Sequence, residues 1–250
     1  NWLNYLFVIA LGIVVGIVLL GVGEYTRYRY SKWSQAITGS GLGVLYVTVY
    51  SIYGIYHLIP ILVDLFLLAI VVTISGVLAI RYGSLITAIL GMLGAFITPL
   101  LLLFAGDVDQ GPVYGILIYL LAIDAGILGV STFRNWRWFT LVGLIGSYGV
   151  VAFWLLENSG DSLMVQPLIM QFGLTMMFLI FVASTAISHV LWRITPKTTD
   201  LTLMTLNAFS YLGVSVYSLK GYTYNLGDYA QDWNGLIALA LAIFYVFFGY

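Results

Sequence analysis

Residues 57–84 read HLIPILVDLFLLAIVVTISGVLAIRYGS, an apolar run between two short breaks. Whether both breaks are turns decides how many transmembrane helices the chain has. A helix needs about 20 apolar residues to cross about 30 Å of hydrocarbon. Residues 61–80 have that length, and Pro60 suits the first turn of a new helix. The sequence therefore predicts one transmembrane helix here, although hydropathy alone leaves both breaks weak.

The same length criterion divides the rest of the chain into apolar runs. It predicts an all-α, polytopic transmembrane helix bundle with short loops and about nine spans. The predicted spans are residues 2–22, 36–56, 61–80, 84–104, 113–133, 138–156, 167–192, 201–219 and 235–250. The composition agrees, because 62% of the 250 residues are hydrophobic and only 8% are charged, whereas a soluble domain is roughly 25% charged.

The charged residues support both weak breaks. Connections with odd numbers, counted from the first span, carry eight of the nine basic residues: Arg27, Arg29, Lys32, Arg81, Arg134, Arg137, Arg193 and Lys197. Connections with even numbers carry only Lys220 and hold six acidic residues: Asp107, Asp109, Glu157, Asp161, Asp228 and Asp232. Removing either break would scramble this alternation. The positive-inside rule thus supports nine spans, with Asn1 outside and the basic connections in the cytoplasm.

Composition also limits the partners and the domain organisation. Nine basic against ten acidic residues give no basic surface for nucleic acid, and the absence of cysteine excludes disulfides and thiolate metal sites. The chain begins without an initiator methionine and ends at Tyr250 within an apolar run. We expect residues 1–250 to form a single transmembrane domain, embedded in a lipid bilayer, that is a piece of a longer polypeptide.

Two carboxyl groups fall inside predicted spans, where an ionisable side chain is costly and marks a candidate site. Asp124 lies near the middle of its span, and Asp64 lies near the outer end of its own. Asp124 is either a proton relay, cation site or substrate anchor, or a carboxyl that joins two helices by hydrogen bonding. Asp64 is either part of a site or the partner of Tyr53 or His57 in a hairpin clasp.

A row of tyrosines precedes this hairpin in VLYVTVYSIYGIYHLIP. Tyr46, Tyr50, Tyr53 and His57 recur at a spacing that keeps side chains on one helix face. Tyr53 and His57 fit the aromatic belt of the outer leaflet. Tyr46 and Tyr50 lie too deep for that belt, so their hydroxyls need partners from another helix, a water-filled cleft or a ligand.

Pro99 lies inside the span predicted at residues 84–104 and leaves a backbone carbonyl near Ala95 without its helical donor. We expect a kink there, which is a hinge, a binding notch or simply the shape of the helix. His57 and His189 are the two histidines and are predicted near opposite faces, which disfavours a two-histidine metal site. No catalytic residue, metal ligand or cofactor is assigned, because phosphate-loop, HExxH and GxSxG motifs are absent.

Three stretches carry a resemblance to a known family. They are RYSKWSQAITGSGLGVLYVTVYSIYGIYHLIP, LAIRYGSLITAILGMLGAFITPLLL and YGILIYLLAIDAGIL. They resemble the glycine- and tyrosine-rich helix ending in YxLxP, the ALRYDS-like turn, and the GGFLTPLLL-like and LLxLDxG-like helices of a bacterial predicted-membrane-protein family, catalogued as domain of unknown function 2339. The matching residues are Gly39, Gly41, Gly43, Tyr46, Tyr56, His57, Pro60, Arg81, Tyr82, Gly91, Gly94, Thr98, Pro99, Asp124 and Gly126.

The resemblance covers residues 1–156 well and residues 157–250 only as generic apolar helix. Gly83 stands where the family usually has an acidic residue, which puts an Arg–Asp clasp at this turn in doubt, and Ala95 replaces the second glycine of a family motif. The resemblance implies a location in the bacterial inner membrane. It implies no activity, because the family is uncharacterised.

Three classes of function stay open. The first is an accessory or assembly subunit that packs its glycine and aromatic faces against other membrane proteins. The second is a transporter or lipid-handling protein with an outward-facing polar cleft. Its lining would be Tyr46, Tyr50, Tyr53, His57, Asp64 and Asp124. The third is an intramembrane enzyme, which we disfavour because no nucleophile or acid–base pair is recognisable.

Overall fold

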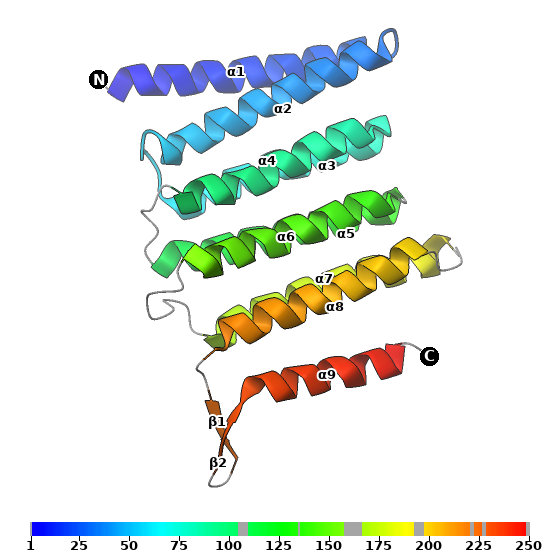
Figure 1. Ribbon diagram of the computed structural model, residues 1–250. Coiled ribbons are helices and arrows are strands. Elements are labelled where there is room, and N and C mark those ends of the chain that lie inside the picture. The colour runs from blue at the N-terminus through cyan, green and yellow to red at the C-terminus, as the bar shows by residue number, and fades with distance from the viewer. Residues whose placement is uncertain are drawn as a thin grey trace. The chain divides into compact units, whose positions relative to one another are not determined.

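The structure, a computed structural model, describes residues 2–104, 110–134, 136–157, 167–192, 198–220, 223–226 and 229–248. Within these residues the chain forms nine helices, one on each of the predicted apolar stretches (Figure 1). They are α1 (Trp2–Thr26), α2 (Ser31–Gly54), α3 (Ile61–Tyr82), α4 (Leu85–Phe104), α5 (Gln110–Phe133), α6 (Arg137–Glu157), α7 (Pro167–Trp192), α8 (Thr198–Ser218) and α9 (Trp233–Phe248).

Six of these helices are long and apolar enough to cross a membrane. Their apolar parts are Asn4–Thr26, Lys32–Gly54, Ile61–Tyr82, Tyr114–Phe133, Arg137–Leu156 and Leu168–Ile187. Helices α4 and α9 contribute the shorter apolar stretches Thr87–Leu101 and Trp233–Phe247, and α8 does not meet the criterion over its described residues. The helical architecture of a membrane protein is thus confirmed, whereas the count of nine spans stays a prediction.

The chain divides into two compact units, residues 1–143 and residues 144–250. In the first unit α1 packs on α2, α2 packs on α3 and α4, and α3 packs on α4 and α5. Leu42, Leu68 and Ala95 lie in its core. In the second unit α7 packs on α8 and α8 packs on α9, around a core that includes Met177 and Phe181.

A short β-hairpin between α8 and α9 is a feature that the all-α prediction lacks. Strand β1 (Thr223–Leu226) pairs antiparallel with β2 (Tyr229–Asp232), and Leu226 lies opposite Tyr229 in the register (Figure 1). Threonine and tyrosine favour extended backbone. Strands of four residues are too short to show a hydrophobic period, so only a polar connection could be predicted here.

Both weak breaks in residues 57–84 are true turns. Pro60 is the N-cap residue of α3, with φ −61° and ψ 146°, and its carbonyl accepts the Asp64 N–H at 3.2 Å. Gly83 caps the other end of α3 in the left-handed region, at φ 63°, which glycine adopts without the steric cost of a side chain. Ser84 then accepts the Thr87 N–H through Oγ at 3.3 Å and caps α4.

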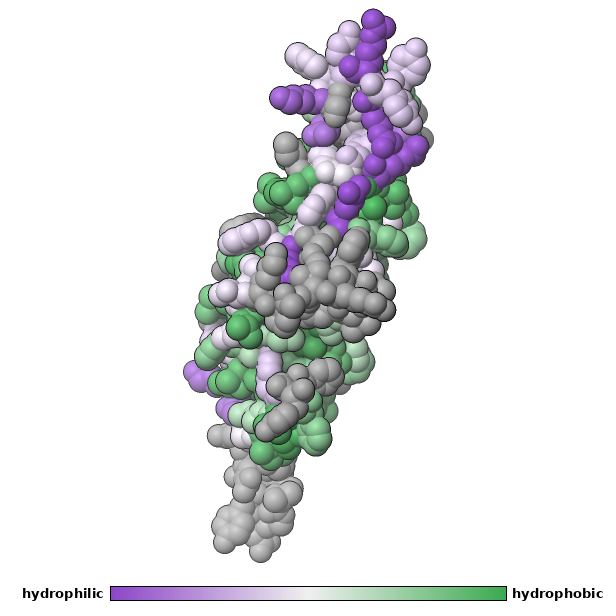
Figure 2. Space-filling model, turned by 90° about the vertical axis from the view of Figure 1, so that its right-hand side faces the viewer, coloured by the Kyte–Doolittle hydropathy of each residue, from purple (hydrophilic) through white to green (hydrophobic). Residues whose placement is uncertain are grey.

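Basic side chains of the first unit gather at one end of its helices. Arg27 donates from Nη2 to the Arg81 carbonyl at 2.8 Å, and Arg134 donates from Nη2 to the Ile80 carbonyl at 3.0 Å. These bonds join the C-terminal ends of α1, α3 and α5. Figure 2 views this side, and hydrophilic residues cluster over the α1–α2 connection. The first three odd-numbered connections therefore share one end of the unit, as the charge alternation predicts.

Several residues of the charge argument lie outside the described part of the chain. They are Asn1, Asp107, Asp109, Asp161, Arg193, Lys197 and Asp228.

Candidate functional site

Tyr46, the deepest tyrosine of the predicted row, has a backbone partner. Its hydroxyl donates to the Gly91 carbonyl of α4 at 2.9 Å, and the side chain is only 8% exposed. Its ring lies over Gly94, where an added Cβ would be 2.6 Å from the ring. Two glycines of α4 thus make room for a tyrosine of α2, and Tyr46 belongs to a packing seam between these helices.

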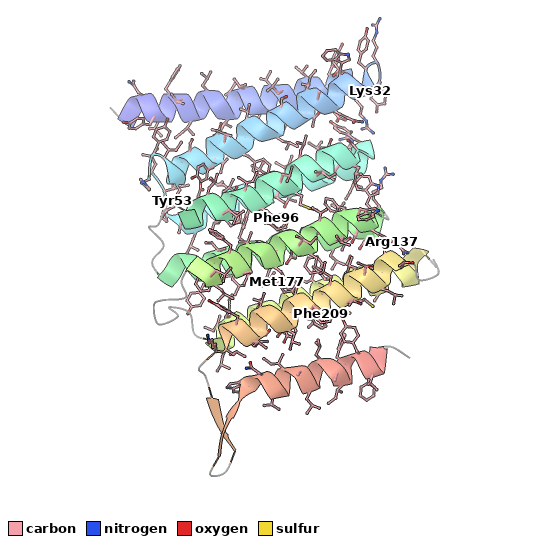
Figure 3. All side chains as sticks on the ribbon, viewed as in Figure 1. Lys32, Tyr53, Phe96, Arg137, Met177 and Phe209 are labelled. Atoms are coloured by element: carbon pink, nitrogen blue, oxygen red, sulfur yellow. The ribbon has the colours of Figure 1, made fainter. Side chains whose placement is uncertain are left out.

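The outer part of the row lies near the surface. Lys32 and Tyr53 mark opposite ends of α2 in Figure 3. Tyr53 is half-buried and meets the exposed His57 ring edge-on, with the ring centroids 5.5 Å apart. Tyr50 is half-buried and its ring lies against Gly54 of its own helix, 2.6 Å from where a Cβ would be. These positions fit an interfacial belt for Tyr53 and His57, with Tyr50 one step deeper.

The proline of α4 is bridged by a side chain from α5. Pro99 lacks the N–H that would bond the Ala95 carbonyl. The Tyr119 hydroxyl donates to this carbonyl instead, at 3.2 Å, and Tyr119 is only 3% exposed. One residue before the proline, Thr98 donates from Oγ1 to the Gly94 carbonyl at 2.9 Å. The sequence predicted the freed carbonyl and missed Tyr119 as its partner.

Asp64 lies in the first turn of α3 and is fully buried. Among the described residues, neither Oδ1 nor Oδ2 has a hydrogen-bond partner. The predicted clasp with Tyr53 or His57 is therefore not formed. Helix α3 packs on α5 here, and Leu65, the next residue along α3, lies beside Gly115 of α5.

The neighbouring turn of α3 explains this burial. Leu62 lies on Gly115 of α5, where an added Cβ would be 2.4 Å from its Cδ2, and Leu65 is 3% exposed beside the same glycine. The close approach of α3 and α5 at Gly115 encloses Asp64 from that side. The short connection predicted Asp64 next to the preceding helix. The contact of α3 with Gly115 could not be predicted, because it depends on which helices pack together.

We group Asp64 with Tyr119, the Ala95 carbonyl and Pro99 as the Asp64 site, because α3 packs on both α4 and α5. A carboxylate anion buried without a partner is very unfavourable, so this side chain is stable when it carries a proton or when a cation lies beside it. The site offers only oxygen atoms, from a carboxyl, a phenol and a backbone carbonyl. Oxygen ligands suit a proton or a hard cation. In the described residues no group of three or more His, Cys, Asp or Glu side chains could hold a metal ion.

Asp124 is also fully buried, on α5. It lies five residues after Tyr119, which is about 7.5 Å along the axis and on a different face of the helix. Of the other candidates, Tyr46 belongs to a seam with α4, Tyr53 is half-buried, His57 is exposed, and Asp64 is buried in the first turn of α3. A common polar cleft for the six residues stays a prediction.

A second cluster of polar side chains lies at the end of the first unit that carries the basic connections. It was not predicted from the sequence. Glu24 of α1 pairs through Oε1 with Arg81 Nη2 at 2.9 Å and accepts the Tyr82 hydroxyl on Oε2 at 2.5 Å. The Arg27 guanidinium lies over the Tyr82 ring, 4.9 Å from its centroid. Glu24 is the acidic residue closest to the first basic connection, and that position was the available signal. The cluster joins α1 to α3.

Gly83 replaces the acidic residue that the resemblance implies, and Arg134 lies beside it. A Cβ at Gly83 would be 3.1 Å from Arg134 Nη2. A carboxylate at this position would face the guanidinium. In this chain the Arg134 side chain bonds the Ile80 carbonyl through Nε and Nη2, so α3 and α5 are still joined.

Buried polar side chains of the second unit connect its helices. Gln171 donates from Nε2 to the Tyr211 hydroxyl at 2.8 Å and to Ser215 Oγ at 3.2 Å. Asn207 is fully buried and donates from Nδ2 to the Phe178 carbonyl at 3.1 Å. These bonds tie α7 to α8, and their geometry is that of helix packing.

One family model matches the whole chain. Its description is "Predicted membrane protein (DUF2339)", and the match covers residues 1–250. The suspected family is therefore confirmed, and the match extends over residues 157–250, where recognisable motifs are sparse. No curated protein and no solved structure matches the chain.

Proposed function

This chain belongs to the predicted membrane protein family DUF2339, and we propose that it is a multi-pass transporter that binds a proton or a small cation at Asp64. The proposal places it in the bacterial inner membrane with nine spans, Asn1 outside and the basic connections in the cytoplasm. Six apolar helices and the gathering of Arg27, Arg81 and Arg134 at one end of the first unit support this topology.

The observation that carries the proposal is the Asp64 carboxyl, which is fully buried with neither oxygen hydrogen-bonded among the described residues. A carboxyl used only for packing would gain by accepting hydrogen bonds, as buried polar groups in folded proteins almost always do. One that must take up and release a cation needs its oxygens available. A buried carboxyl whose two oxygens make no hydrogen bond among the described residues is thus suited to bind a cation.

The proline inside α4, a helix that packs on α3, supports the same function. Transporters commonly place their ion sites where a broken helix offers backbone carbonyls at membrane depth. Pro99 breaks the hydrogen bonding of α4, and Tyr119 holds the freed Ala95 carbonyl at 3.2 Å. Tyr119 therefore links α5, which packs on α3, to the carbonyl that Pro99 leaves free. We propose that occupancy of Asp64 is relayed through Tyr119 to α4, with Pro99 as the hinge.

The test is cation flux into liposomes that contain the purified full chain. Proton uptake is followed with an enclosed pH-sensitive dye and sodium uptake with a radioactive tracer. We expect uptake of one of these cations above that of protein-free liposomes. Asp64→Asn should abolish it, because the amide has the same shape and cannot ionise. Tyr119→Phe should lower it.

Tyr46→Phe is the matched control for Tyr119→Phe. It removes the hydroxyl of another buried tyrosine that donates to an α4 carbonyl, here that of Gly91 at 2.9 Å. Flux through Tyr46→Phe should equal that of the wild type. The proposal fails if the wild type carries neither cation, or if Asp64→Asn retains its flux.

A second candidate, an accessory or assembly subunit, is favoured by α1. This helix packs on α2 and is the least buried of the six candidate spans. Its side chains Phe7 and Ile17 are 70% and 58% exposed, so it offers a long apolar face to a neighbouring helix. Purification from native membranes in mild detergent tests this role. Migration of the chain alone, without a stoichiometric partner, would rule it out.

A further inference from the structure

A hollow lies between α3, α4 and α5 in the half of the first unit that carries the basic connections. Its volume is about 220 Å³, and apolar and small side chains line it. On α5, Gly126 and Gly129 create this space, because a Cβ added at either position would meet nothing within 4 Å. Both glycines line the hollow, together with Val77 of α3 and Phe133 of α5, which are 56% and 65% exposed. We call it the α3–α5 groove.

The groove has the length of one membrane leaflet. Its lining on α3 runs from Ala69 to Ile80, and its lining on α5 runs from Ala122 to Phe133. Eleven residues of helix span about 16 Å, and half of the hydrocarbon core is about 15 Å. One end of the groove therefore lies near the membrane middle and the other at the interface on the basic side. That is the space that one acyl chain occupies.

A cation stands at the interfacial end. Arg134 directly follows Phe133, is exposed, and is fixed by two hydrogen bonds from Nε and Nη2 to the Ile80 carbonyl, at 3.3 and 3.0 Å. Arg81 at the same end is paired with Glu24 at 2.9 Å. In the described part of the chain, Arg134 has no such carboxylate partner. Its charge is thus available to an anion at the level of the lipid headgroups.

We propose that the α3–α5 groove binds one anionic phospholipid of the leaflet on the basic side. An acyl chain lies along Gly126 and Gly129, and the phosphate pairs with Arg134. The apolar lining accommodates an acyl chain, and the length of the groove matches one leaflet. Arg134 favours a negatively charged headgroup. This site is separate from Asp64, which lies in the first turn of α3, at the other end of the helix from Arg81.

The experiment counts lipids that stay with the full chain. The protein is reconstituted in nanodiscs of equal parts phosphatidylglycerol and phosphatidylcholine and then released from them. Native mass spectrometry measures the mass of the protein with the lipids that it retains. We expect one retained phospholipid, mostly phosphatidylglycerol. Gly126→Leu should remove it by filling the groove. Arg134→Gln should keep a phospholipid but lower the preference for phosphatidylglycerol about fivefold, the effect of losing one basic side chain at the surface.

Two matched variants control for general effects of these substitutions. Gly21→Leu makes the same change at a helical glycine whose added Cβ also meets nothing within 4 Å and which lies outside the groove. Arg29→Gln removes another basic residue of this end. Both should retain lipid as the wild type does. The proposal is overturned if Gly126→Leu keeps its phospholipid, if Gly21→Leu loses it equally, or if a second copy of the chain is retained instead.

Discussion

Replacing Asp64 with leucine should make the protein more stable while it abolishes cation binding. Leucine has the same number of side-chain heavy atoms and the same branching as aspartate, but its methyl groups are larger than carboxyl oxygens, so tighter packing between α3 and α5 offsets part of the gain. Aspartate is fully buried and neither of its oxygens is hydrogen-bonded among the described residues. The substitution therefore removes an unsatisfied polar group without removing any hydrogen bond that the structure describes.

The size of the effect follows from the cost of that group. A buried polar group left without a partner costs about 1–3 kcal/mol. We expect Asp64→Leu to raise the free energy of unfolding by about this amount. For a chain of this size, 1 kcal/mol corresponds to about 2–4 °C in Tm, so the expected increase is between about 2 and 12 °C.

The assay is unfolding of the purified full chain in mild detergent, by thermal ramp and by SDS titration. Asp64→Asn is the control, because the amide keeps the shape and stays polar and unsatisfied; its stability should be close to that of the wild type. If Asp64→Leu is less stable than both the wild type and Asp64→Asn, the carboxyl has a partner that stabilises the fold, which contradicts cation binding at Asp64.

Three further predictions concern the packing of the first unit. Gly94→Ala should lower the free energy of unfolding by about 1–3 kcal/mol, since its Cβ would lie 2.6 Å from the Tyr46 ring; equal stability in SDS titration would contradict this. Tyr119→Phe should lower the free energy of unfolding by about 1–3 kcal/mol, because the buried Ala95 carbonyl loses its donor. The loss should be clearly smaller in a Pro99→Ala background, where the helix supplies its own N–H. A double-mutant cycle without coupling would contradict the hydrogen bond from Tyr119 to Ala95. Gly83→Ala should cost about 1–2 kcal/mol at φ 63°, and Gly83→Asp should cost less because its carboxylate reaches a guanidinium; thermal unfolding that ranks them in reverse would refute this.

Much of the fold could be predicted because the hydropathy and charge patterns that define helices and connections are local properties of the sequence. The nine helices of the described residues fall on the predicted stretches, and both weak breaks of residues 57–84 are turns. Pro60 and Gly83 mark these turns through local backbone preferences that do not depend on the rest of the fold. The carbonyl freed by Pro99 was predictable for the same reason, because it follows from the missing N–H of one residue.

The candidate site could be predicted only in part because it depends on which helices face each other. Depth identified Asp64 and Tyr46 as polar groups in need of an explanation, but their surroundings differ. Tyr46 meets the glycine face of α4 and donates to Gly91, whereas neither oxygen of Asp64 is hydrogen-bonded among the described residues. Nothing in a single sequence distinguishes these outcomes, since helix rotation is set by packing between side chains far apart in the chain.

The reactivity of the Asp64 carboxyl with an apolar carbodiimide tests most directly whether Asp64 binds a cation. Such reagents enter the membrane and modify protonated carboxyl groups, and mass spectrometry of the digested protein locates the modified residue. We expect modification at Asp64 that falls when the transported cation is added in excess, and none in Asp64→Asn. An Asp64 that stays unmodified in the reconstituted full chain, or whose modification no cation affects, would contradict cation binding at Asp64.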